Sequence, residues 1–403
     1  MRHGKGKALK RIGGVILALA CTVALSLGAI GLVGCSGSGG SGGSSEETWT
    51  FTDSLGRQVE LPKNLERICP SGHTAQQVLL TMAPDKMVGL SQPLNDDQLK
   101  IFGDKFKDYP VFGAVLGAKD DFNREAVAAA KPQVIIDTGE VKKDTKESLD
   151  ALQEQLGIPV VFVEAYLEDY GSAYKTLGEL LGMEERGNQL SEYCNRVYSK
   201  VEDTMKTIPE SQRVNMAYLL GENGLNAIAK TSVQAQVIDM VANNVVVVDD
   251  ASGKGSGNEI SLEQIAVWNP DLIIFQKGSI YNTVGDDPAW QGISAIANDN
   301  YYEVPNNPWC WMNNPPTVNQ LMGMQWLPRL LYPNAFDDSI EDVTRDYYKT
   351  MYNYDLSDAE MSELLTGALP KWGATAIYDA APGAIQWVPG AWAKPRNMIA
   401  PRT

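Results

Sequence analysis

The sequence predicts an α/β protein built from two matching halves. Residues 125–136 read EAVAAAKPQVII and residues 263–274 read EQIAVWNPDLII, each with a glutamate, a proline seven residues later and a final Ile-Ile. Asn123 and Ser261 stand two positions before these glutamates, and both residue types accept the free N–H groups of a helix start. The proline ends the helix, and the apolar run suits a buried parallel strand. Two such halves predict two lobes with a ligand groove between them.

The first half alternates between predicted strands and helices. Residues 49–61 (WTFTDSLGRQVEL) favour two short strands around a Leu-Gly turn. Beside the first repeat, we expect strands at 67–70, 86–90 and 160–163 and helices at 74–82 and 146–156. This alternation predicts a parallel, doubly wound sheet.

A long helix-favouring stretch follows at residues 171–208, and Gly182 and Gly187 are expected to divide it into two helices. A helix of about 20 residues spans roughly 30 Å. The second helix, near residues 188–206, is therefore expected to join the lobes as a rigid interlobe helix.

The second half repeats the alternation. We expect a strand at 214–220 paired with residues 225–229, further strands at 245–248 and 301–304, and helices at 233–242, 318–331, 338–352 and 357–365. A Gly-rich loop at 252–258 (SGKGSGN) precedes the second repeat and lacks the spacing of a phosphate-binding loop.

The N-terminus has the features of an exported lipoprotein. Basic residues precede an apolar stretch at 15–33, as in a signal peptide, and LVGC resembles a bacterial lipobox that ends at Cys35. An uncleaved transmembrane anchor is the alternative, and both interpretations place the body on the extracytoplasmic face of the cell membrane. The expected organisation is a signal peptide at 1–34, a lipidated Cys35 with a Gly/Ser tether at 35–48, an N-terminal lobe at 49–186, an interlobe helix at 187–210, a C-terminal lobe at 211–369 and a tail of unassigned role at 370–403.

Charge and motifs exclude several function classes. A net charge of −16 argues against binding to nucleic acid or to an anionic lipid surface. GxSxG and HExxH motifs are missing, and the mature chain has one histidine, so we expect no enzyme. No CxxC spacing occurs, and no metal site or cofactor is expected; Cys69, Cys194 and Cys310 are either one disulfide plus a free thiol or three buried thiols.

Candidate ligand-binding residues come from the loops that follow the strands, where open α/β sheets bind ligands. His73 can ligate a metal or haem iron or hydrogen-bond a ligand, and an exposed loop histidine is the alternative. Trp309, Trp311 and Met312 form an apolar, polarizable wall suited to a bulky ligand, and core packing between the lobes is the alternative. The complete set is Ser71, Gly72, His73, Thr74, Gln92, Gly139, Glu140, Lys277, Tyr281, Trp309, Trp311 and Met312.

A series of segments matches one protein class in order and spacing. They are 53–68 (DSLGRQVELPKNLERI), 83–91 (APDKMVGLS), both repeats, 156–164 (LGIPVVFVE), 177–190 (LGELLGMEERGNQL) and 330–354, and together they cover roughly residues 49–365. On these segments the chain resembles the substrate-binding lipoproteins of ABC importers for iron complexes and cobalamin, the helical-backbone class. The loop PSGHTAQ at 70–76 departs from the usual cobalamin-like loop.

The resemblance implies two Rossmann-like lobes with parallel sheets, joined by a single long helix, with the ligand cleft between them. It also implies that Glu125 and Glu263 dock onto arginines of the permease. Family ligands are ferric siderophores, haem, cobalamin and, in some members, molybdate or tungstate. The predicted cleft loops hold no cluster of arginines, which disfavours highly anionic catecholate siderophores.

The expected function is therefore capture of an iron complex (a siderophore or haem) or a corrinoid and delivery to the permease. The expected partners are the ABC permease and ATPase subunits, the cargo and, through the lipid anchor, the membrane, while the protein itself is expected to be a monomer. The alternatives are a molybdate or tungstate binder of the same class, a surface adhesion or sensing module, and an exported hydrolase.

Overall fold

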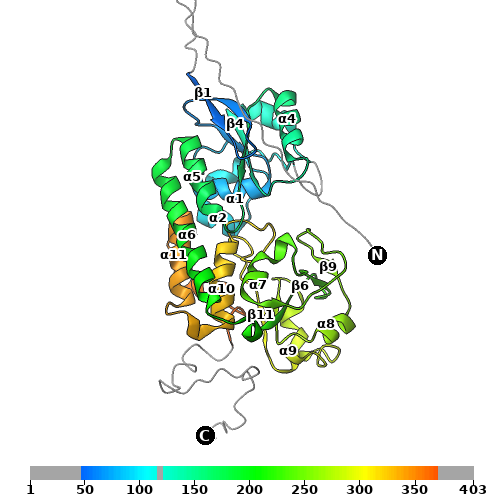
Figure 1. Ribbon diagram of the computed structural model, residues 1–403. Helices are drawn as coiled ribbons and strands as arrows, with labels where there is room; N and C mark the ends of the chain where they lie inside the picture. The colour runs from blue at the N-terminus through cyan, green and yellow to red at the C-terminus, as the bar shows by residue number, and fades with distance from the viewer. Residues whose placement is uncertain (1–46, 116–120, 371–403) are drawn as a thin grey trace, which may run out of the picture. The chain divides into compact units, whose positions relative to one another are not determined.

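A computed structural model describes residues 47–115 and 121–370, which form an α/β fold with two main sheets and a separate two-stranded hairpin (Figure 1). The predicted signal peptide, Cys35, most of the tether and the tail from residue 371 lie outside the described residues. In the described ranges, no helix combines the length and apolar character needed to span a membrane.

The first sheet is parallel, with the order β3-β4-β5. Single bridges join Ile68 to Met87 and Leu90 to Val111, and they extend this order on the far side of β3. The result is a doubly wound arrangement whose order reverses between β3 and β4. The strand expected at 86–90 is reduced to these bridges. The strands of this half are β1 (Thr48–Thr52) and β2 (Gln58–Pro62), which form an antiparallel hairpin, and β3 (Ile68–Pro70), β4 (Val134–Gly139) and β5 (Val160–Glu164).

The helices of the first half agree with the predicted alternation and end in two long helices. They are α1 (His73–Met82), α2 (Asp96–Phe102), η1 (Asp104–Asp108), α3 (Arg124–Ala130), α4 (Thr145–Leu156), α5 (Tyr170–Leu181) and α6 (Glu184–Lys206).

Only one of the two predicted glycine breaks occurs between α5 and α6. Gly182 ends α5 with a φ of 63°, a left-handed conformation that glycine adopts readily. Gly187 lies inside α6 instead, and a Cβ atom there would come within 2.7 Å of the Gly178 Cα. The prediction of a break at Gly187 is therefore wrong, because this glycine permits close packing of two helices.

The second sheet has the order β11-β10-β6-β7-β9, and β8 also pairs with β6. Strands β8, β6, β10 and β11 are parallel, while β7 and β9 run antiparallel to their neighbours. The strand expected at 245–248 is wrong, because pairing with β6 stops soon after β8. The strands are β6 (Asn215–Leu220), β7 (Asn226–Ala227), β8 (Asn243–Asn244), β9 (Asn258–Glu259), β10 (Leu272–Phe275) and β11 (Tyr301–Glu303).

The helical segments of the second half include two longer helices near the C-terminal end of the described chain. They are η2 (Glu210–Gln212), η3 (Val233–Ala235), α7 (Gln236–Val241), α8 (Leu262–Trp268), η4 (Ile280–Asn282), η5 (Val284–Asp286), α9 (Ser294–Ala297), α10 (Gln320–Leu331), η6 (Pro333–Ala335), α11 (Ile340–Tyr352) and α12 (Asp358–Leu364).

The two sequence repeats adopt the same local structure. Asn123 caps α3 by accepting from the Ala126 N–H at 3.0 Å, and Ser261 caps α8 by accepting from the Gln264 N–H at 3.3 Å. Each helix ends in a left-handed residue, and a parallel strand follows the proline. The predicted helix–strand repeat is confirmed.

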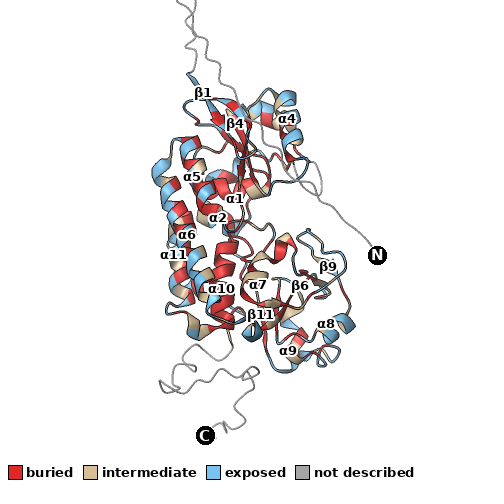
Figure 2. Cartoon of the chain, in the orientation of Figure 1, coloured by how far each residue is buried: buried red, intermediate tan, exposed pale blue. Residues whose placement is uncertain are grey.

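The two sheets share one hydrophobic core. A single cluster of buried side chains extends from Phe51 in the hairpin to Ala368 near the end of the described chain. Two smaller clusters cover the remaining faces of the two sheets. Helix α10 is buried along its whole length (Figure 2). Cys69, Cys194 and Cys310 are buried free thiols, so the alternative without a disulfide is the one observed.

Candidate ligand-binding site

The loops after β3 and β4 meet where the strand order reverses, the usual ligand position in open α/β sheets. The Ser71 hydroxyl donates a hydrogen bond to the Asp137 carboxylate, which ties the loop after β3 to strand β4. Both side chains are buried. The Thr138 hydroxyl beside them is also buried, and no hydrogen-bond partner for it occurs among the described residues.

Burial controls the acidity of Asp137. Removal from water raises the pKa of this carboxyl from 3.8 to about 6, against the opposing hydrogen bonds from Ser71 and the Thr138 backbone. Burial therefore makes ionisation of this carboxyl more costly than that of an exposed aspartate.

His73 is the first residue of α1, and its neighbours favour one tautomer. Gln76 Oε1 accepts from the Ser91 hydroxyl at 2.9 Å and from the backbone N–H groups of Ser91 and Gln92 at 2.6 and 3.0 Å. A hydroxyl has one hydrogen. Ser91 Oγ therefore accepts from His73 Nδ1, 3.0 Å away, and the proton of the neutral imidazole lies on Nδ1.

His73 Nε2 consequently has a free lone pair. Burial lowers the pKa of this half-buried side chain below its ordinary 6.5, with partial compensation by the nearby Asp121 carboxylate. The neutral imidazole is thus favoured near pH 7. Within the described ranges Nε2 has no hydrogen-bond partner, so it can accept a hydrogen bond or donate its electron pair to a metal.

The remaining candidate residues of the first half lie around the segment between β3 and α1. A Cβ atom on Gly72 would be 3.3 Å from Ala114 Cβ, and one on Gly139 would be 3.9 Å from the Thr74 methyl group. Gln92 is connected through Gln76, whose Nε2 donates to the Gln92 carbonyl at 3.2 Å. Glu140 is exposed. The structure therefore brings together most of the first-half residues that the sequence analysis selected.

The second sheet has an equivalent reversal between β6 and β10. The Ser279 hydroxyl donates to the Gly221 carbonyl at 2.6 Å and joins the two loops there. Lys277 is exposed beside them. Tyr281 packs against Tyr301 of β11, with 5.7 Å between the ring centroids, so it lies toward the β11 edge of the sheet.

Trp309, Trp311 and Met312 are buried rather than presented on a surface, with exposures of 4%, 1% and 0%. The Trp309 ring lies 5.4 Å from Phe102 of α2 and 6.2 Å from Tyr352 of α11. This placement favours the core-packing alternative, and contact between these three residues and a ligand stays a prediction.

A set of buried polar residues was missed by the sequence analysis. Thr317 donates to Gln77 of α1, and Asn319 donates to the Cys310 and Asn313 carbonyls. Asn313 donates in turn to the Gly255 carbonyl at 3.3 Å. A glutamine inside a helix has no signature of its own, and the amide-rich run NNPPTVNQ at 313–320 was the one available signal.

Glu125 and Glu263 are exposed in the first turns of α3 and α8. Hydrogen bonds from the backbone and from Ser261 lower the pKa of Glu263. These two glutamates therefore occupy equivalent positions in the two repeats.

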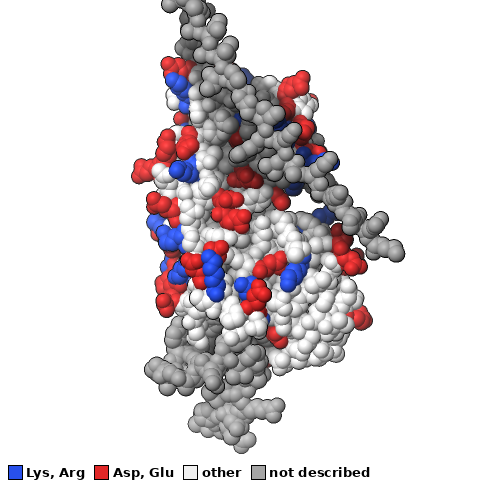
Figure 3. Space-filling model, in the orientation of Figure 1, with Lys and Arg blue, Asp and Glu red and all other residues white. Residues whose placement is uncertain are grey.

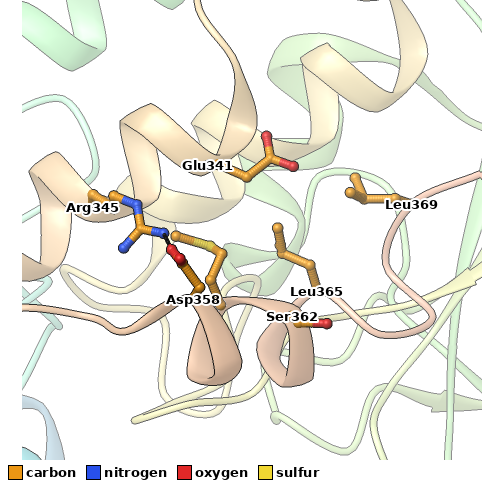
Figure 4. A pocket seen from close by; sticks show the side chains of 7 residues that line it. Glu341, Arg345, Asp358, Ser362, Leu365 and Leu369 are labelled. Atoms are coloured by element: carbon orange, nitrogen blue, oxygen red, sulfur yellow. Dashed lines mark hydrogen bonds and ion pairs between the residues drawn. The ribbon is translucent and has the colours of Figure 1, made fainter. Parts of the chain in front are cut away.

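Two surface grooves occur away from these loops. One, of about 430 Å³, lies between α11 and α12, where Arg345 pairs with Asp358 beside Leu365 and Leu369 (Figure 4). The other, of about 510 Å³, is lined by residues of α2 and η1. Neither groove contains a predicted site residue.

Charge is unevenly distributed on the face seen in Figure 3. Acidic and basic side chains are interspersed along the edge formed by α5, α6 and α11, whereas the surface over the second sheet is mostly uncharged. Among the described residues, His, Cys, Asp and Glu side chains form no group of three or more that could hold a metal ion.

Comparison with known proteins identifies a family. Residues 78–308, more than half of the chain, match the family model described as "Periplasmic binding protein". No curated protein sequence matches the chain.

Several solved structures are similar to this fold. An ABC transporter solute-binding protein from Sulfurospirillum deleyianum has a TM-score of 0.73 and 25% identity, covering 79% of this chain and 99% of that one. A periplasmic solute-binding protein from Veillonella parvula has a TM-score of 0.65 and 23% identity, with 80% and 98% coverage. The molybdate-binding protein MolA from Haemophilus influenzae has a TM-score of 0.61 and 19% identity, with 77% and 99% coverage.

Proposed function

The chain belongs to the periplasmic binding protein family and is a solute-binding protein of an ABC transporter, and we propose that its solute is a metal complex. The cargo class we propose is an iron complex, as a siderophore or haem, or a corrinoid. The observation that supports this best is His73, whose Nε2 lone pair is kept free by the hydrogen bond from Nδ1 to Ser91. An imidazole fixed through its other nitrogen is the usual arrangement of a protein ligand to a metal.

The identity of the cargo is tested with protein purified from its own host. Native mass spectrometry and an absorbance spectrum should reveal a bound metal complex with a haem, corrinoid or siderophore spectrum. His73→Ala should then weaken affinity for that complex by at least about tenfold, the effect of losing one strong interaction. A His73→Ala variant with unchanged affinity would contradict the role given to His73.

Molybdate or tungstate is the second candidate. MolA has a similar fold and is described as bound to molybdate, although an identity of 19% supports a similarity of fold and not of ligand. An oxyanion of molybdenum or tungsten in the native mass spectrum would replace the iron complex or corrinoid as the cargo. Purified protein that binds no metal species of any kind would favour the adhesion or sensing alternative.

Delivery is proposed to depend on Glu125 and Glu263 as contacts for arginines of the permease. Both are exposed and equivalent in the two repeats. The double variant Glu125→Arg with Glu263→Arg should abolish uptake and preserve cargo affinity. Glu179→Arg with Glu192→Arg, a matched pair of exposed glutamates on α5 and α6, should leave uptake intact. Normal uptake in the first variant would rule out this docking role.

Membrane attachment is proposed to depend on lipid at Cys35. The lipobox-like LVGC and the Gly/Ser tether support this proposal. Cys35→Ser should release the protein from the membrane fraction. A variant that stays in the membrane fraction would favour the uncleaved transmembrane anchor.

A further inference from the structure

A polar network connects helix α1 of the first half with the Gly-rich loop at 252–258 of the second half. Gln77 Oε1 accepts from Thr317, which lies next to Asn319 in the segment before α10. Asn319 donates to the Asn313 carbonyl at 3.4 Å, and Asn313 donates to the Gly255 carbonyl at 3.3 Å. The network therefore crosses from one half of the molecule to the other.

Gln234 joins the same loop from the segment before α7. Its Nε2 donates to the Gly253 carbonyl at 3.2 Å. Ser232, two residues earlier, accepts from the Ala235 N–H through its backbone carbonyl at 2.9 Å. The Gly253 and Gly255 carbonyls, which accept from Gln234 and Asn313, are thus two residues apart in one loop.

Three side-chain atoms of these segments have no hydrogen-bond partner in the described part of the chain: Gln77 Nε2, Ser232 Oγ and Gln234 Oε1. Their residues are buried, with exposures of 0%, 7% and 6%. Buried polar atoms in native proteins are almost always paired, because an unpaired one costs the full desolvation penalty. In Gln234 the bond from Nε2 to the Gly253 carbonyl fixes where Oε1 lies, whereas the single hydrogen of the Thr317 hydroxyl has two acceptors in reach, Gln77 Oε1 and Asn319 Oδ1, so in either orientation of its amide Gln77 keeps one unpaired amide atom.

Gln77 also lies one helical turn from His73 on the same face of α1, since residues four apart in a helix are neighbours. The unpaired Nε2 of Gln77 and the free Nε2 of His73 therefore belong to one side of one helix. This links the polar network to the loop in which the metal complex is proposed to bind.

The Gly-rich loop covers the network at the surface. A Cβ atom on Gly255 would come 2.1 Å from Asn314 Oδ1, so the loop packs against the Asn313 segment only because residue 255 has no side chain. Lys254 and Ser256 beside it are exposed. The loop accepts hydrogen bonds from Gln234 and Asn313 through its Gly253 and Gly255 carbonyls, so opening it would free those two amides for a ligand.

We propose that Gln77, Ser232 and Gln234 form a subsite for carboxamide groups of an uncharged metal complex, and that the Gly-rich loop opens to admit them; this rests on the proposed function. The unpaired amide atoms of Gln77 and Gln234 need hydrogen-bond partners, and carboxamide groups carry both an acceptor oxygen and donor hydrogens. The network consists of amides, hydroxyls and backbone carbonyls with no charged side chain. A multiply charged cargo group would find no compensating charge there.

The test measures binding of three probes by isothermal titration calorimetry. They are cyanocobalamin, which is uncharged and rich in carboxamides, ferrioxamine B, an amide-containing hydroxamate complex, and molybdate, a dianion. At least one of the first two should bind more tightly than molybdate. Gln77→Met and Gln234→Met, which keep side-chain volume, should each weaken that binding about 5- to 10-fold, as expected for one hydrogen bond. Gln58→Met, an exposed position in β2, is the matched control.

Loop opening has its own measurement, which does not depend on how the variants fold. Hydrogen exchange of the wild-type amides at 252–258 should slow when the bound probe is added, because the subsite would then be occupied. Tightest binding to molybdate, or equal affinity in Gln77→Met, Gln234→Met and wild type, would overturn the carboxamide subsite and leave the proposed function intact. Failure to bind any metal species, including those from its own host, would remove the proposed function and this inference together.

Discussion

At the scale of single residues, strand β4 and the start of α1 provide an acid and a base whose charged forms are both disfavoured by burial. Burial raises the pKa of Asp137 to about 6, and it lowers the pKa of His73 below 6.5. The Ser71 and Ser91 hydroxyls hold these two side chains in place. Burial therefore disfavours the charged form of both groups, which leaves His73 neutral near pH 7 and Asp137 ionised at an energetic cost.

Asp137→Asn should stabilise the protein at pH 7.5. The folded-state pKa of Asp137 is raised, so the penalty for ionising it is absent below about pH 3.8, grows as the pH rises and is complete above about pH 6. A shift of this size corresponds to about 3 kcal/mol. Urea denaturation should show a gain in the free energy of unfolding at pH 7.5 and none at pH 3.5, with Asp249→Asn, an exposed control, neutral at both. A gain at pH 3.5 equal to that at pH 7.5 would contradict the account.

Cargo affinity should persist at pH 6.5 and fall only under more acidic conditions. Protonation of His73 Nε2 would remove its lone pair, and the pKa of His73 lies below the ordinary 6.5 because of burial. Binding titrations between pH 5 and pH 8 should therefore show a midpoint below 6.5 in the wild type and none in His73→Gln. A wild-type midpoint above 6.5 would mean that another group controls the pH dependence.

At the scale of elements, one arginine joins three helices. Arg186 of α6 donates to the Thr81 carbonyl at the end of α1 and to the Thr350 and Met351 carbonyls at the end of α11, at 2.8 to 3.2 Å. It also donates to Gln189 at 2.8 Å. The carbonyl ends of helices carry partial negative charge and attract a cation. Arg186 therefore fixes α1, and with it the helix that carries His73 and Gln77, relative to α6 and α11.

Arg186→Met should lower the free energy of unfolding by about 2–4 kcal/mol, because several carbonyls lose hydrogen bonds from a charged donor. Hydrogen exchange should speed up specifically at the C-terminal turns of α1 and α11. Arg196 lies on the same helix as Arg186, and Arg196→Met, which removes an exposed ion pair with Asp346 of α11, should change stability by less than about 1 kcal/mol. Equal effects of the two variants would show that Arg186 has no special role.

At the scale of the whole molecule, the shared core limits movement between the halves. The aromatic contact of Phe102, Trp309 and Tyr352 joins α2, the loop after β11 and α11, with Trp309 and Tyr352 inside the continuous buried cluster and Phe102 packed against it. Separating these side chains would expose large apolar surfaces, at a cost of about 1.5–3 kcal/mol for each. Cargo binding is therefore expected to move local loops rather than the halves.

Distances between spin labels at Lys146→Cys and Val267→Cys should change by less than about 1 Å when cargo binds, as in other preorganised complexes. Both positions are exposed, and Cys69, Cys194 and Cys310 are buried and should stay unlabelled. A shortening of several ångströms would reveal closure of a hinge and contradict the shared-core argument.

Local chemistry explains which features could be predicted from the sequence. The repeats at 125–136 and 263–274 were predicted because capping side chains and prolines act within a few residues. The expected strand at 86–90 is reduced to single bridges, and the one expected at 245–248 was wrong. In both cases the pairing depends on neighbours far away in the chain. Gly187 was interpreted as a break because its contact with Gly178 is invisible in the sequence.

The site was predicted less completely than the fold. Ligands of open α/β sheets bind beyond the carboxyl ends of the strands, and this principle predicted Ser71, His73 and Gly139. The structure places these residues around the junction of β3 and β4. Trp309 and Trp311 suit a ligand wall and a core equally well, so composition could not decide between these roles. Gln77 was missed because its unpaired amide atom is defined by packing with Thr317, a contact 240 residues away.

The continuous buried cluster also has a practical consequence for truncation. A fragment that ended at residue 210, or one that began there, would leave half of that cluster facing water. Neither piece is expected to be soluble when expressed alone, whereas co-expression of the two should restore a stable pair.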